Sequence, residues 1–175
     1  EKVVQLRQHA KLITEQTQEK ANKLFSTIKS SPLDNIDVFV SNLASLRALR
    51  GEVISLKEIR YVDTDFIDNL EKEIVEQTER ISQHCVTFLL DEKALEPYHI
   101  RVNEKQNAID AISKVAEGKK LEEEVSQITA DLEMLIDIVS NLKIDDTSHA
   151  TQIINNISLI FATLNKVKAE IKNKI

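Results

Sequence analysis

The sequence predicts an all-α fold: an elongated helical bundle with a long antiparallel coiled-coil hairpin and about five main helices. Three observations carry this prediction. The 175 residues include only two glycines and two prolines, so the chain can form few tight turns. Apolar residues recur at steps of three and four along most of the chain, as on one face of a helix. Charged residues make up 30% and aromatic residues 4%, a balance typical of long helices.

Residues 1–118 are predicted to form a helical bundle segment. Ser31 and Pro32 end its first helix, because the residue before a proline is disfavoured in the α region. Asp63 or Thr64 caps its third helix, and Gly118 closes its fourth and weakest helix in a left-handed conformation. The four helices are expected near residues 1–30, 34–61, 64–90 and 97–116.

Residues 119–175 are predicted to form the hairpin. Two apolar series follow the narrow stripe of a coiled-coil seam. They are Leu121, Val125, Ile128, Leu132, Leu135, Val139 and Leu142, then Ala150, Ile153, Ile157, Ile160, Leu164, Val167 and Ile171. The short polar break between them places the turn near residues 144–148, so the two helices should fold back on each other.

This break contains the first candidate for chemistry. Asp145, Asp146 and His149 could supply oxygen and nitrogen ligands to a divalent metal. Asp, Thr and Ser directly before an apolar-periodic run are also the residues expected at a helix start, where their oxygens accept from free N–H groups. We favour the capping interpretation, because the sequence identifies no further metal ligands.

Other motifs are also better explained by helix structure than by catalysis. Gly118, Lys119 and Lys120 lack the second glycine, the hydroxyl residue and the preceding strand of a phosphate loop. His84 and Cys85 are neighbours on a helix and point about 100° apart, so they do not form a nucleophilic pair. A di-metal bundle requires two Glu-x-x-His pairs on different helices, whereas only His99 among the four histidines follows a glutamate, Glu96, by three residues. No catalytic, cofactor-binding or metal-binding residue is therefore predicted.

The last helix carries the one local concentration of positive charge that we identify. These side chains are candidates for phosphate or DNA contact, although lysines beside a coiled-coil seam are also common. The net charge of −6 argues against a general nucleic-acid surface. The candidate residues are Lys166, Lys168, Lys172 and Lys174.

The chain has no apolar run of about 20 residues, so no membrane partner is expected. The single cysteine, Cys85, excludes an internal disulfide and suits a reducing compartment. We therefore expect a cytoplasmic location. The chain starts at Glu1 and its helical pattern is still running at Ile175, and we interpret it as a segment of a longer protein.

Three stretches resemble a known family. "RGEVISLKEIRYVD" (residues 50–63), "FLLDEKALEPYHIRV" (88–102) and "LIDIVSNLKIDDTSHATQIINNISLIFATLNKVKAEI" (135–171) look like the helical coiled-coil region of large bacterial proteins described as DNA repair ATPases. The resemblance covers most of residues 40–175. It implies an AAA-type module, and hence ATP, elsewhere in the full-length protein. No Walker motif is present in this segment.

The leading hypothesis is a non-catalytic interaction or coupling arm of such an ATPase. Its partners would be other regions of the same protein or a second copy. The alternative is a sensory helical bundle of a signalling receptor that binds a small ligand between its helices. That alternative requires transmembrane helices on both sides of the segment. An enzyme built inside a helical bundle is the least favoured hypothesis.

Overall fold

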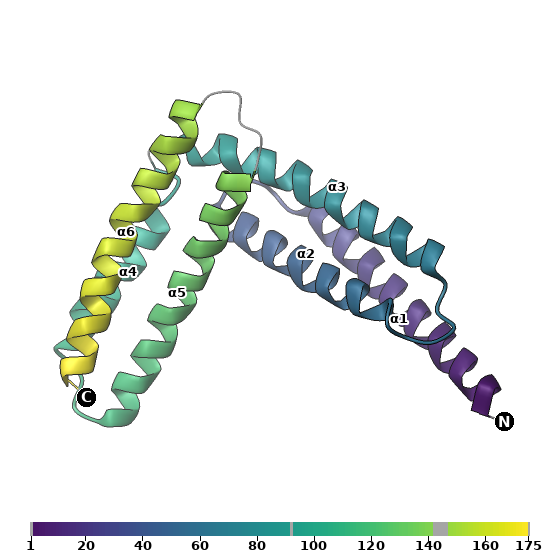
Figure 1. The fold of residues 1–175 in the computed structure, drawn as a ribbon. Coiled ribbons are helices and arrows are strands. Elements are labelled where there is room, and N and C mark those ends of the chain that lie inside the picture. Colours follow the sequence, from purple (N-terminus) through teal and green to yellow (C-terminus); the bar gives the residue numbers. More distant parts are fainter. Residues whose placement is uncertain (1, 92, 142–146, 175) are drawn as a thin grey trace. The chain divides into compact units, whose positions relative to one another are not determined.

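The structure is a computed structural model that describes residues 2–91, 93–141 and 147–174. These residues form six α-helices and no strand (Figure 1). The predicted all-α class is confirmed. The structure has six helices rather than about five, and the weakly patterned segment around Pro97 is a regular helix of 14 residues.

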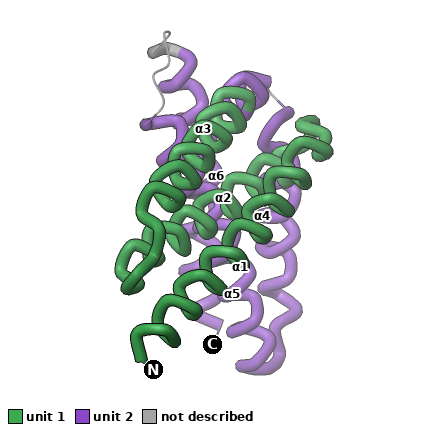
Figure 2. Tube along the Cα trace, turned by 90° about the vertical axis from the view of Figure 1, so that its right-hand side faces the viewer, with its two compact units in different colours: residues 1–84 green, residues 85–175 purple. Residues whose placement is uncertain are grey.

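The chain divides into two compact units, residues 1–84 and 85–175, which are coloured separately in Figure 2. The division falls within α3 (Thr64–Leu89). It therefore differs from the expected division at residue 118. The reason is that α4 (Glu96–Ile109) contacts both of the helices that follow it, rather than standing apart from them.

The first unit contains α1 (Lys2–Ser30), α2 (Ile36–Leu56) and most of α3. The helix ends follow local chemistry. α1 stops two residues before Pro32, as predicted. The side chain of Asn35 accepts from the N–H of Asp37 and caps α2, and Asp63 Oδ1 accepts from the N–H of Phe66 at the start of α3. The cap predicted at residue 63 is therefore confirmed.

The core of the first unit consists of apolar side chains spaced by three and four residues. α1 and α2 contact each other. α1 contributes mostly small residues at its buried positions, which lets a neighbouring backbone approach closely. The core residues are Ala10, Ala21, Ile28, Ile36, Phe39, Val40, Leu43, Leu46, Leu49, Val53, Leu56, Ile67, Leu70, Ile74 and Ile81.

α2 ends at Leu56, five residues earlier than expected. The segment that follows turns sharply back toward α3. Tyr61 in this turn has a φ of 68°, and it is the one non-glycine residue with positive φ among those described. The backbone thus leaves the helix through a conformation that an L-residue adopts at a cost.

The second unit contains the last five residues of α3, together with α4, α5 (Val115–Asn141) and α6 (Thr147–Lys174). Pro97 lies in the first turn of α4, where a backbone N–H would have no intrahelical acceptor, so proline removes no helix hydrogen bond there. α4, α5 and α6 all contact one another. α5 and α6 lie side by side and run in opposite directions (Figure 1).

Two local predictions for residues 97–118 are wrong. The helix expected to reach residue 116 ends at Ile109. Gly118 does not close it, because Gly118 lies in the first turn of α5 and no described glycine has positive φ. The carboxylate of Glu117 accepts from the backbone N–H of Ser113 at 3.0 Å, and this contact starts α5 before the glycine is reached.

No helix in the described part of the chain is long and apolar enough to cross a bilayer.

Candidate functional site

The apolar stripes predicted for the hairpin lie on α5 and α6. Every predicted stripe residue from Leu121 to Val139 is buried, and so is every one from Ile153 to Ile171. Ala150 is half-buried, and Leu142 lies outside the described residues. The periodicity therefore identified the packed faces of both helices correctly.

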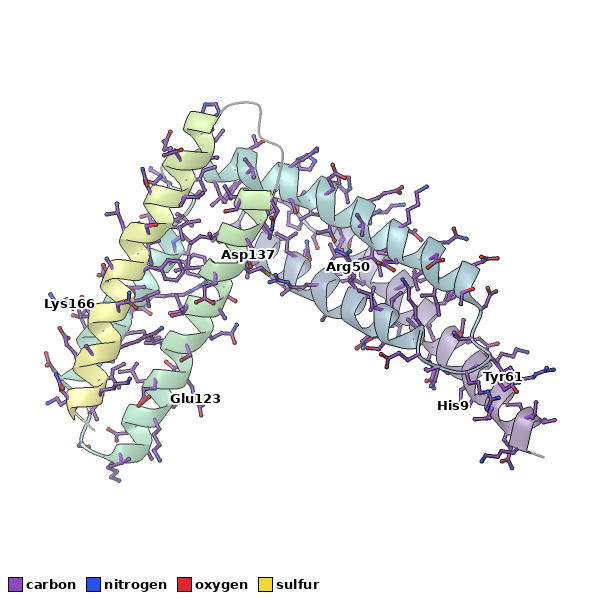
Figure 3. The ribbon with its side chains drawn as sticks, viewed as in Figure 1. His9, Arg50, Tyr61, Glu123, Asp137 and Lys166 are labelled. Carbon is purple, nitrogen blue, oxygen red and sulfur yellow. The ribbon has the colours of Figure 1, made fainter. Side chains whose placement is uncertain are left out.

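The four candidate lysines lie on α6 but do not converge (Figure 3 labels Lys166). At about 100° per residue, Lys168 and Lys172 fall on one flank of the buried stripe and Lys166 and Lys174 on the other. Lys168 is half-buried, whereas the other three are exposed. Glu170 lies one turn from both Lys166 and Lys174 in the same row, which places a negative charge between them.

The polar break before α6 is only partly described. Asp145 and Asp146 lie outside the described residues, as do residues 144–146 of the turn predicted near residues 144–148, whereas residues 147 and 148 begin α6. His149 is exposed in the first turn of α6. Among the residues that are described, no three His, Cys, Asp or Glu side chains gather where they could hold a metal ion.

Cys85 is fully buried, and its neighbour His84 is exposed. Burial raises the pKa of the Cys85 thiol from its ordinary 9.0 to about 12. A thiol with such a pKa is almost entirely protonated at neutral pH, so it is a poor nucleophile and a poor metal ligand.

The polar contacts of α4 and α5 are structural. The Lys105 ammonium donates to the Glu124 carboxylate and joins the two helices. This hydrogen bond is the main reason that the pKa of Glu124 is lowered. A shallow, open depression on α5 is lined by Lys119, Glu122, Glu123, Ser126 and Gln127. All five come from one helix, so no second element closes over a ligand there.

A cluster that the sequence analysis missed lies in the first unit (Figure 3 labels Tyr61). The guanidinium carbon of Arg7, on α1, is 5.1 Å from the centroid of the Tyr61 ring. That of Arg60, next to Tyr61 in the turn after α2, is 5.3 Å from the same centroid. Both distances are within the range of a cation–π interaction. We call Arg7, Arg60 and Tyr61 the Arg–Tyr–Arg cluster.

Part of this cluster had a signal in the sequence. Arg60 and Tyr61 are adjacent, and residues 2–14 contain Lys2, Arg7 and Lys11 without a single carboxylate. The contact between Arg7 and Tyr61 joins residues 54 positions apart and depends on how α1 packs. Periodicity alone does not predict it.

The comparisons with known proteins bear on the second unit. A family model described as "Domain of unknown function (DUF7902)" matches residues 93–175, just under half of the chain. The matched segment contains α4, α5 and α6 complete. No curated protein and no solved structure matches the chain.

The matched segment begins before α4, at nearly the same place as the second compact unit. The residues that recur in this family therefore include all three helices that pack together there. The two long apolar faces of this unit are buried inside it, and its described surface carries scattered charge.

Proposed function

We propose that α5 and α6 form an antiparallel coiled-coil hairpin that serves as a non-catalytic interaction or coupling arm of a larger, cytoplasmic ATPase associated with DNA repair. The observation that carries the proposal is the pair of buried stripes, which extends over 19 residues of α5 and 19 of α6 in alternating steps of three and four. The resemblance of residues 40–175 to the coiled-coil regions of such ATPases supports the same assignment.

The spacing of the stripes also supports a specific register. If the hairpin turns about residue 144, residues equally far from the turn stand opposite each other. Leu132 then faces Ile157, Ile128 faces Ile160, and Val125 faces Leu164. All six side chains are buried. A register of this kind keeps apolar residues in contact along the whole arm.

The arm would act by position and contact. Helices of 27 and 28 residues span about 40 Å at 1.5 Å per residue, which is enough to carry a movement from one domain to another. Its partners would be other regions of the same protein or a second copy of the arm. The ATPase module would lie elsewhere in the full-length chain.

The test uses the full-length protein and compares ATP binding with ATP hydrolysis. We expect the pair Leu132→Ala and Ile157→Ala, which weakens the seam, to reduce hydrolysis several-fold and leave the affinity for ATP unchanged. Leu159→Ala is the matched control, because Leu159 is on the same helix but 66% exposed. Circular dichroism must show that the helices remain. Absence of ATP binding by the full-length protein, or equal rates in the seam and control variants, would refute the proposal.

A further inference from the structure

We propose that Arg7 and Arg60, held beside the Tyr61 ring, bind the phosphate groups of a nucleic-acid strand. This inference concerns the first unit and does not depend on the arm proposed for α5 and α6. It rests on the Arg–Tyr–Arg cluster, on the charge around it and on the conformation of Tyr61.

The first observation is that the Tyr61 ring orients both guanidinium groups, while no carboxylate in the described part of the chain neutralises their charge. Each is within 5.3 Å of the centroid of the Tyr61 ring, and neither pairs with a carboxylate in the described part of the chain. Arg50, by comparison, faces Glu71 at 3.8 Å. A guanidinium that packs on an aromatic ring keeps N–H donors at its edge, and these donors suit the bidentate binding of a phosphate.

The second observation is the charge of the neighbouring helix. Lys11 lies one turn after Arg7 on the same side of α1, and the first carboxylate that follows is Glu15. Arg7, Lys11 and Arg60 are all exposed. Arg7 and Arg60 thus meet beside the Tyr61 ring from two segments of the chain, and Lys11 lies one turn further along α1, while the exposed carboxylates Glu58 and Asp63 flank Arg60 in the turn. An anion that reaches the cluster meets donors from both segments.

The third observation is the backbone of Tyr61. Glycine would adopt its φ of 68° without strain, whereas tyrosine adopts it at a cost in free energy. That conformation holds the ring beside both guanidinium groups while 42% of the residue stays exposed. Strained backbone often marks a ligand site.

The exposure of the cluster favours an extended ligand over a small molecule. Small molecules are usually held in concave pockets, whereas a nucleic-acid strand lies across an exposed surface that offers cations and an aromatic side chain. The cluster is of the second kind. Its donors come from both α1 and the turn after α2, so successive phosphates of one strand could engage Arg7 and Arg60.

The test is fluorescence anisotropy of labelled single-stranded oligo(dT) with the whole chain at low ionic strength. We expect the double variant Arg7→Gln/Arg60→Gln to weaken binding by about tenfold. The slope of log affinity against log salt should fall by about 1.4, because about 0.7 is lost per phosphate contact with a single strand. Arg80→Gln is the matched control: it removes the same charge from α3, outside the cluster, and should change affinity less than about twofold.

Additional variants and competitors distinguish a nucleic-acid strand from other anionic ligands. Tyr61→Phe keeps the ring and should keep binding, and thermal melts of each variant show whether it remains folded. Inorganic pyrophosphate and polyglutamate serve as competitors, and both should be weaker than the oligonucleotide. No binding of oligo(dT) would overturn the proposal, and so would equal losses in the double and control variants. Tighter binding of polyglutamate would instead assign the cluster to an acidic protein, and tighter binding of pyrophosphate to a small anion.

Discussion

The Nζ of Lys57, just after α2, lies 2.8 Å from Oε2 of Glu71 on α3. Glu71 also faces Arg50 at 3.8 Å, so one carboxylate ties the end of α2 to the next helix. The hydrogen bond from Lys57 is the largest cause of the lowered pKa of Glu71, and the same bond is the largest cause of the raised pKa of Lys57. The ionised pair is therefore favoured in the folded state.

Replacing Glu71 should cost a small amount of stability, and the cost should depend on pH. A carboxyl group with a lowered pKa stabilises the folded state above its ordinary pKa of 4.5, and this contribution is lost as pH falls through the folded pKa. Thermal melts of Glu71→Gln should therefore show a slightly lower Tm at neutral pH and no difference in strong acid. Because the pair is exposed, high salt should also reduce the effect.

Glu73→Gln is the control for this prediction, since Glu73 is an exposed carboxylate on the same helix. Equal Tm changes in the Glu71 and Glu73 variants would mean that net charge, rather than the contact with Lys57, sets the effect.

Gly51 in α2 should be a position where alanine stabilises the protein. It lies in the helix interior, and an added Cβ would meet no atom within 4 Å. Alanine loses less backbone entropy on folding than glycine, so Gly51→Ala should raise the free energy of unfolding by about 0.5–1 kcal/mol. Urea denaturation measures this directly. A decrease in stability would show that the helix is not straight and regular at this position.

The strain at Tyr61 predicts an unusual order of variant stabilities. Tyr61→Ala loses the two ring contacts and keeps the strained φ, whereas Tyr61→Gly loses the contacts and relieves the strain. The glycine variant should be more stable than the alanine variant by about 1 kcal/mol. Tyr61→Phe should match the natural protein in the same denaturation experiment. Alanine more stable than glycine would contradict the left-handed conformation.

Cys85 should make the folded state less stable at alkaline pH. Its thiol titrates near 9.0 in an exposed environment and at about 12 in the folded protein, so the unfolded chain loses its proton first as pH rises. Stability from this group is complete below pH 9.0 and should fall by about 1.4 kcal/mol per pH unit above it. Denaturation of the natural protein and of Cys85→Ala across this range isolates the effect. Parallel pH profiles would show that the thiol is accessible to water.

The helical class and the buried faces could be predicted from the sequence because both are local. The stripe from Leu121 to Val139 is a repeat along one helix, and each of its members is buried. Ser31, Pro32 and Asp63 mark helix ends through chemistry that acts over a few residues. For these features, neighbours in the sequence carry enough information.

The features that could not be predicted from the sequence depend on contacts between distant segments or on competing local signals. Gly118 suggested a helix end, but the contact between Ser113 and Glu117 starts α5 before it. The position of α4 beside α5 and α6 depends on packing, so the expected division at residue 118 differs from the compact units. The lysines of α6 are close in sequence, yet helix geometry sends Lys166 and Lys168 to opposite flanks. The Arg–Tyr–Arg cluster is assembled only when α1 meets the turn after α2.

The central claim is that α5 and α6 form an antiparallel hairpin arm, and distances between nitroxide labels in the full-length protein test it most directly. Labels at Ala130→Cys and Leu159→Cys, in a Cys85→Ala background, stand at the same level of the proposed arm. Labels at Ala130→Cys and Asn173→Cys are offset by about 21 Å along it. The arm predicts one narrow, short distance for the first pair and a clearly longer one for the second. A broad distribution, or a second distance no longer than the first, would contradict it.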